Sequence, residues 1–315
     1  MDTLSDDAME TCFSFLGNKN YRFTAGTCRR FRRLHQFYGN RLGKHQTTSW
    51  QHAVLSASCA KLCWQDHREQ KLTREELKQV ISKLLSTAIA MGSPTDVLEW
   101  ARQHGGECND WQVFCVAASR GHVHVLKWAH SRGLDWSSPA ISYQAAHHGH
   151  VDILEFAYRY GNGRHFDAGS FAARGGHLPV FQWFKKRGLL HKYNWHVWYE
   201  AARSGHVHVL DWLVHQGLTP DSTLISGAAK GGHVNVLEWA LLQHDKLCWN
   251  SKTCAHAAYH GHLETLVWLH QHACPWDGNV FYWAQRGGHE QIVEWARENE
   301  CPTESDEIFE IDRYV

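Results

Sequence analysis

Histidine is the residue type whose number and spacing in this chain could most readily support chemistry. The chain of 315 residues contains 26 histidines. An imidazole ring can ligate zinc or exchange a proton near neutral pH. Seven of the histidines follow a glycine, at steps of 28, 27, 29, 27, 29 and 27 residues: Gly121-His122, Gly149-His150, Gly176-His177, Gly205-His206, Gly232-His233, Gly261-His262 and Gly288-His289.

The regular spacing of these pairs argues against a metal site. One histidine per repeat would form a ladder with rungs about 10 Å apart, the packing distance of helices, and no single ion spans that gap. Adjacent rings such as His147 and His148 have no third ligand nearby in the sequence. The sequence therefore predicts no metal ligands. It favours a structural role in which each turn histidine hydrogen-bonds to the backbone of a neighbouring turn.

Catalytic and cofactor-binding motifs are missing from the sequence as well. It contains no Gly-rich phosphate loop, no G-x-S-x-G elbow and no H-E-x-x-H. We therefore expect neither an enzyme nor a bound cofactor. The ten cysteines show no zinc or redox spacing, the nearest approach being Cys59 and Cys63, and they are typical of reduced, packed thiols.

The charge composition sets limits on the partner. The chain carries 32 basic and 32 acidic side chains, so its formal net charge of zero implies no strongly charged partner for the molecule as a whole. Without an evident basic position repeated along the array, we expect no nucleic-acid partner. A local basic run could act as a nuclear localisation signal or contact an acidic partner: Arg29, Arg30, Arg32 and Arg33. The solvated face of a helix is the favoured interpretation.

The Gly-His pairs mark an internal repeat. Segments such as YQAAHHGHVDILEFAYRYG from Tyr143 and YEAARSGHVHVLDWLVHQG from Tyr199 align over their whole length. An eighth copy precedes the seven, with Ser93 and Pro94 in the Gly-His positions and Trp100 in the aromatic position. In the other copies an aromatic residue stands seven positions after the glycine: Trp128, Phe156, Trp183, Trp212, Trp239, Trp268 and Trp295.

Each copy predicts two helices joined by a tight turn. Paired alanines such as Ala145 and Ala146 favour helix and let a neighbouring helix approach closely. Glycine then ends the first helix, because it enters the left-handed region without a Cβ penalty. The second helix carries an apolar stripe that one copy cannot bury by itself, so the copies must stack. The predicted fold is therefore an all-α solenoid.

The pattern A-A-x-x-G-H-x-x-V-x-x-L-x-x-x-G resembles the central half of the ankyrin consensus, over roughly two thirds of the chain. The period of about 28 residues is shorter than the ~33 of standard ankyrin repeats, and the T-P-L-H opening is missing. This short, Trp-rich form is similar to ankyrin proteins of algae, oomycetes and large DNA viruses. The resemblance implies an ankyrin-like helical solenoid of about eight short repeats with short or absent β-hairpins. Tryptophans mark its loops, where packing is favoured over an interface role: Trp111, Trp136, Trp195, Trp249 and Trp276.

The chain divides into four predicted segments. Residues 1–40 form an F-box-like helical module and 41–72 a helical connector. Residues 73–302 form the repeat array, and 303–315 an acidic tail. The array begins with a helix, because Thr73 and Glu76 match a capping box and an apolar helical stripe follows them.

The first segment resembles an F-box in two stretches, LSDDAMETCFSFL and YRFTAGTCRRFRRLH. This resemblance implies that the module docks on a Skp-type adaptor of a cullin ubiquitin ligase, while the repeats select the substrate. The apolar residues implied in the module core and the adaptor interface are Leu4, Met9, Phe13, Leu16, Phe31 and Leu34.

The function expected from these resemblances is a protein-interaction module, a substrate receptor that links an unidentified target protein to the ligase. The alternative is a non-catalytic ankyrin scaffold or sequestering protein with no ubiquitin role. In either case we expect a monomer. Without a secretory signal or an apolar stretch near the ~20 residues of a membrane span, we expect an intracellular protein, cytoplasmic or nuclear. The expected target-binding residues break the repeat pattern near loops, where unique side chains can carry specificity: Tyr158, Tyr160, Arg164, His165 and His191.

Overall fold

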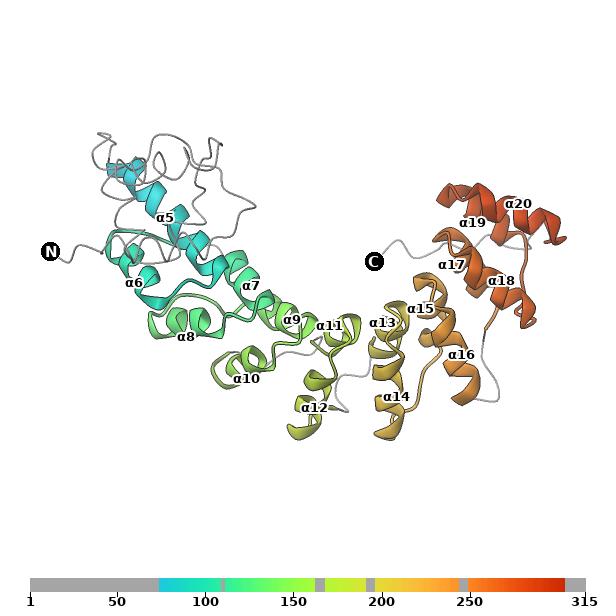
Figure 1. Ribbon diagram of the computed structural model, residues 1–315, viewed down its shortest axis with the longest axis horizontal. Coiled ribbons are helices and arrows are strands. Elements are labelled where there is room, and N and C mark those ends of the chain that lie inside the picture. The colour runs from blue at the N-terminus through green and yellow to red at the C-terminus, as the bar shows by residue number, and fades with distance from the viewer. Residues whose placement is uncertain (1–73, 109–110, 162–167, 191–195, 244–248, 304–315) are drawn as a thin grey trace, which may run out of the picture. The chain divides into compact units, whose positions relative to one another are not determined.

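The computed structural model of the chain describes residues 74–108, 111–161, 168–190, 196–243 and 249–303. Within these ranges every regular element is a helix, and the 16 helices follow one another in eight pairs (Figure 1). Their bounds are α5 (Arg74–Met91), α6 (Thr95–Gln103), α7 (Trp111–Ser119), α8 (Val123–Ser131), α9 (Pro139–His147), α10 (Val151–Tyr160), α11 (Ala168–Gly175), α12 (Leu178–Lys186), α13 (Val197–Arg203), α14 (Val207–His215), α15 (Thr223–Gly231), α16 (Val234–Gln243), α17 (Ser251–Tyr259), α18 (Leu263–Gln271), α19 (Asn279–Gly287) and α20 (Glu290–Glu298).

The helices fall into two compact units, which are described separately. The first contains α5, α6, α8 and α7 as far as Ala117. The second contains residues 118–123, which are the end of α7, the turn after it and the first residue of α8, together with α9 to α20. None of the helices in the described ranges is long and apolar enough to cross a membrane.

The second unit is a stack of helix pairs in two rows. The first helices of successive pairs, α9, α11, α13, α15, α17 and α19, pack side by side, and each also contacts the second helix of its own pair (Figure 1). The paired alanines lie between these helices and have no exposed surface, as at Ala145, Ala146, Ala201 and Ala202. The predicted all-α stack of short helix pairs is therefore confirmed.

The turn between the two helices of a pair has one geometry throughout the stack. Gly149 has a φ of 77°, and its N–H donates to the Ala146 carbonyl at 3.2 Å. The next N–H, of His150, reaches back to the Ala145 carbonyl at 2.8 Å. This double closure satisfies two carbonyls that a helix end would leave free, and it requires a left-handed residue, which favours glycine. The alanine pair thus supplies both small packing surfaces and the acceptors of the cap.

The first unit corrects one detail of the sequence interpretation. Gly92, with a φ of 66°, takes the turn-glycine position, and Ser93 takes the histidine position with its N–H bonded to the Ala88 carbonyl at 2.9 Å. Pro94 is an additional residue that caps α6. Counting seven positions back from Trp100 placed the turn one residue late, because this copy has an insertion after the turn.

Glycines that precede the turn glycine bring alternate first helices into backbone contact. A Cβ on Gly175, Gly231 or Gly287 would lie 2.0, 2.0 or 2.4 Å from the carbonyl oxygen of His147, Arg203 or Tyr259. The intervening copies carry His148, Ser204 and His260 at this position. The three glycines are spaced by 56 residues, so the stack repeats in modules of two copies. We call the α9–α11, α13–α15 and α17–α19 contacts the glycine interfaces.

Thr265 on α18 occupies a core position that other copies fill with an apolar β-branched residue. Its side chain has no exposed surface, and Oγ1 has no hydrogen-bond partner among the described residues. Val236 and Ile292 are the equivalent residues in the neighbouring copies. A buried hydroxyl without a partner keeps its desolvation cost, and valine has nearly the same shape.

We therefore expect Thr265→Val to raise the free energy of unfolding by about 1–2 kcal/mol, measured by chemical denaturation. The reciprocal change Val236→Thr should lower it by a similar amount. A lower midpoint for Thr265→Val would show that the hydroxyl has a partner in solution.

Candidate functional site

The turn histidines bond each copy to the preceding one. The Nε2 atoms of His150, His206, His262 and His289 each lie 3.0 Å from a carbonyl oxygen of the copy before. His177 and His233 contact their preceding copies in the same way. The acceptor always stands two residues before the preceding turn glycine: Ser119, His147, Arg174, Arg203, Lys230 and Tyr259.

The same rings also explain why the preceding residue must be glycine. A Cβ on Gly121, Gly149, Gly176, Gly205, Gly232 or Gly261 would approach the ring of the following copy's histidine to 2.5–2.8 Å. Gly288 belongs to the last copy, and no atom lies within 4 Å of its added Cβ. The Gly-His ladder is therefore an interface between copies, in which the ring covers the backbone and bonds to it.

Several histidines along this ladder have lowered pKa values. Burial is the main cause for His148, His177 and His233, and neighbouring imidazoles add to it. Burial also lowers the pKa of His260 to about 4, with further contributions from His262, Arg203 and Lys230. These rings are consequently neutral at pH 7, as the packing of one ring near the next requires.

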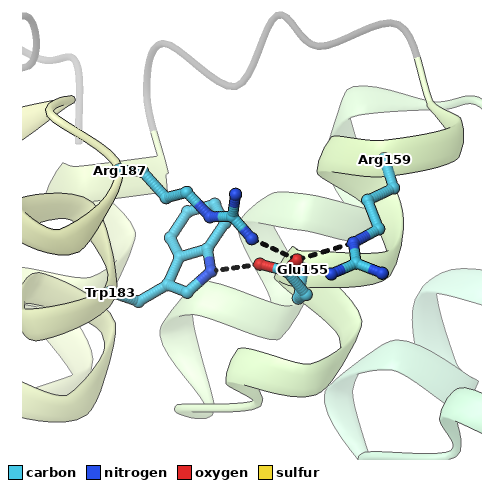
Figure 2. Close-up of polar contacts among 4 residues, drawn as sticks. All are labelled: Glu155, Arg159, Trp183 and Arg187. Atoms are coloured by element: carbon cyan, nitrogen blue, oxygen red, sulfur yellow. Dashed lines mark hydrogen bonds and ion pairs between the residues drawn. The ribbon is translucent and has the colours of Figure 1, made fainter.

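Glu155 on α10 joins two second helices of the stack (Figure 2). Its Oε2 accepts the indole N–H of Trp183 at 2.8 Å, and its Oε1 accepts from Arg159 at 2.8 Å and from Arg187. The hydrogen bond from Trp183 is the largest cause that lowers the pKa of Glu155 to about 2, although burial opposes it. Trp128 and Trp239 donate to Glu99 and Asp211 in the same register. In these three copies the aromatic residue is therefore tied to an acid of the preceding copy.

Glu155→Gln is expected to lower the free energy of unfolding at pH 7 by about 1–2 kcal/mol, because three charge-assisted bonds are weakened at a side chain that is 25% exposed. The folded pKa lies below the ordinary value of 4.5, so this stability is present above pH 4.5. It is lost as the pH falls from 4.5 toward 2. Denaturation midpoints measured across that range should converge for the two proteins. Glu238→Gln, an exposed change on α16, is the control and should leave the midpoint unchanged at pH 7.

The predicted target-binding residues are only partly within the described chain. Tyr158 packs edge-on against Trp183 with ring centroids 5.8 Å apart, and the Arg187 guanidinium lies 5.4 Å from its ring centre. Tyr160 is 55% exposed at the end of α10. The remaining predicted site residues lie outside the described residues: Arg164, His165 and His191, and the adaptor-binding set Leu4, Met9, Phe13, Leu16, Phe31 and Leu34.

The first helices carry a row of basic side chains that the sequence reasoning missed. In the position two residues before the turn glycine, Arg174, Arg203, Lys230 and Arg286 occur, so a basic position does recur along the array. Three of these cations lie over aromatic rings: Arg174 over Phe171 at 5.8 Å, Lys230 over Tyr199 at 5.5 Å and Arg286 over Trp283 at 5.5 Å. Aligning this column of the repeat would have revealed it, but a net charge of zero concealed it.

Charge is segregated between the two rows of the second unit. The described first helices α9 to α19 contain five Lys or Arg residues against one Glu, a formal charge of +4. The second helices α10 to α20 contain four Lys or Arg against eight Asp or Glu, a formal charge of −4. The row of first helices is thus the face of this unit on which an acidic group would be attracted.

Comparison with known proteins adds no family to this description. Neither a protein-family model nor a curated protein matches the chain.

Proposed function

We propose that the protein is a non-catalytic recognition module, an ankyrin-like array whose first-helix row binds a target protein. The observation that carries the proposal is the contrast between two kinds of position. The Gly-His ladder is nearly invariant from copy to copy and makes the stack. The first-helix positions beside it vary, and the exposed cations Arg174 and Arg286 lie over aromatic rings there. Invariant positions serve stacking, and variable ones serve specificity.

The F-box-like resemblance of residues 1–40 extends this proposal to a substrate receptor. Such a receptor would hold its target on the repeats and dock on a Skp-type adaptor through its N-terminal module. The competing proposal is a scaffold that binds the same target and has no ubiquitin role. Both proposals place target binding on the same face of the array, and they differ only in whether the protein binds an adaptor.

A pull-down with a purified Skp-type adaptor separates the two. The full chain should retain the adaptor, and Phe13→Asp combined with Leu16→Asp should abolish retention, because these residues belong to the implied interface. Tyr160→Asp, an exposed change in the array, is the matched control and should bind the adaptor normally. Circular dichroism should show the same helix content for all three proteins. Absence of binding by the unaltered chain would leave the scaffold.

A further inference from the structure

One ion pair on the first-helix row shows what kind of group its cations accept. Arg174 on α11 binds Glu200 on α13 through two bonds, Nε to Oε2 at 2.8 Å and Nη2 to Oε1 at 2.9 Å. Glu200 is 9% exposed and is the one acidic residue within the first helices α9 to α19. A two-pronged guanidinium–carboxylate pair has strict geometry, so this position is shaped for a carboxylate.

The next copies repeat the cation without the carboxylate. In the register that places Glu200 opposite Arg174, Gly227 stands opposite Arg203, and His256 stands opposite Lys230. Arg286 donates to the Tyr282 hydroxyl at 3.0 Å and lies over Trp283. Across the described ranges, no carboxylate pairs with Arg203, Lys230 or Arg286. The acids of this unit are concentrated on the other row of helices.

The aromatic partners hold two of these cations in place. Lys230 is only 7% exposed and lies over the Tyr199 ring, while Arg286 lies over Trp283. Arg286 is exposed, so a cation fixed in this way loses little side-chain freedom when it binds an anion, whereas Lys230 is covered and acts only through its field. The field of Arg203 and Lys230 extends to the next copy, where both contribute to the lowered pKa of His260. The two cations on α13 and α15 therefore act on the same imidazole of the next copy.

We propose that the first-helix row of the second unit binds an extended acidic segment of the target protein, with carboxylates at Arg203 and Arg286. This inference rests on the proposed function and names its partner class. Helices in the stack are separated by about 10 Å, and an extended peptide advances 3.3–3.6 Å per residue. Arg203 on α13 and Arg286 on α19 are three helices apart in the row, so their carboxylates are about nine residues apart in the peptide.

An acidic peptide fits this face better than a nucleic acid does. The described first helices have a formal charge of only +4 after Glu200 is counted, spread over six helices. Affinity for a phosphate backbone grows with the number of closely spaced phosphates that Lys and Arg neutralise, and duplex DNA carries one charge per about 1.7 Å of helix axis. A few fixed cations at wide spacing are better matched to individual carboxylates.

The test is fluorescence anisotropy with the full chain and a labelled 12-residue peptide that has Glu at every third position in a Gly-Ser background. We expect binding at low salt, and no binding of the same peptide with Gln in place of Glu. The double change Arg203→Gln and Arg286→Gln should raise the dissociation constant for the Glu peptide by about tenfold or more, because charged contacts are lost. Lys185→Gln with Lys186→Gln on α12 removes the same charge from the other row and should change the dissociation constant less than about twofold.

Three outcomes would overturn the inference. One is equal weakening by both double variants, which would reduce the effect to net charge. The second is tighter binding of a 12-nucleotide oligothymidylate than of the Glu peptide, together with a loss of that binding when Arg203 and Arg286 are changed to Gln. This result would make the face a nucleic-acid site. The third is selection from a random peptide library of binders without Asp or Glu, which would refute the acidic partner but keep the recognition function. A library that yields no binder at all would refute both.

Discussion

Gly231→Ala is expected to destabilise the array by about 3 kcal/mol, at the upper end of the usual cost of overpacking. Its new Cβ would lie 2.0 Å from the Arg203 carbonyl oxygen and 2.7 Å from the carbon of that carbonyl. Because the contacted atoms are backbone, no side chain can rotate away, and α15 must shift from α13. The measurement is the midpoint of denaturation followed by circular dichroism, with the value expected to fall sharply.

Ser204→Ala is the matched control for this change. Ser204 stands at the same position of the preceding copy, where a side chain is already accommodated, so alanine should change the midpoint little. Gly175→Ala should reproduce the loss, since its Cβ would also lie 2.0 Å from a backbone oxygen, that of His147. Equal midpoints for Gly231→Ala and Ser204→Ala would show that the glycine interfaces are looser in solution than described.

Gly232→Ala is the second change with a large expected effect, and Gly288→Ala is its internal reference. Both glycines have the same left-handed φ, 75° and 76°, so alanine costs about 1–2 kcal/mol of backbone strain at either position. At Gly232 the new Cβ would also lie 2.5 Å from the ring of His262. Displacement of that ring breaks its 3.0 Å bond to the Lys230 carbonyl, which adds about 1 kcal/mol or more.

The difference between the two variants therefore measures one rung of the Gly-His ladder. We expect Gly232→Ala to be less stable than Gly288→Ala by at least about 1 kcal/mol, in denaturation experiments under identical conditions. His262→Ala combined with Gly232→Ala should recover part of the loss, because the clash is removed with the ring. Equal losses at the two glycines would mean that the ring contributes nothing to the contact between copies.

The repeat architecture could be predicted from the sequence because its causes are local. Three features recur at a regular spacing: a glycine at a left-handed turn, paired alanines before it and an aromatic residue seven positions after it. Each of these features has one physical interpretation. The first turn was assigned to Ser93 instead of Gly92, because a single inserted residue changes the distance from the turn to Trp100 without disturbing the helices on either side.

The contacts between copies were less predictable than the copies themselves. Trp183 donates to Glu155, and Arg174 donates to Glu200, because stacking brings these residues of adjacent copies opposite each other. The sequence of a single copy does not contain that register. The basic row on the first helices, by contrast, is visible in the aligned position two residues before the turn glycine, and equal totals of acid and base hid it. The predictions for residues 1–40 and for Arg164, His165 and His191 stay predictions, because they lie outside the described residues.

The glycine interfaces also bear on how the second unit would give way under mechanical load. Among the described residues, glycines whose added Cβ would meet a backbone oxygen of the neighbouring first helix occur at every second interface, so we expect adjacent copies to be joined alternately by tighter and looser contacts. In a linear array, rupture proceeds through the weaker neighbour contacts. A molecule pulled from its ends should therefore lengthen in increments of 56 residues, about 200 Å of extended chain, rather than in increments of a single copy.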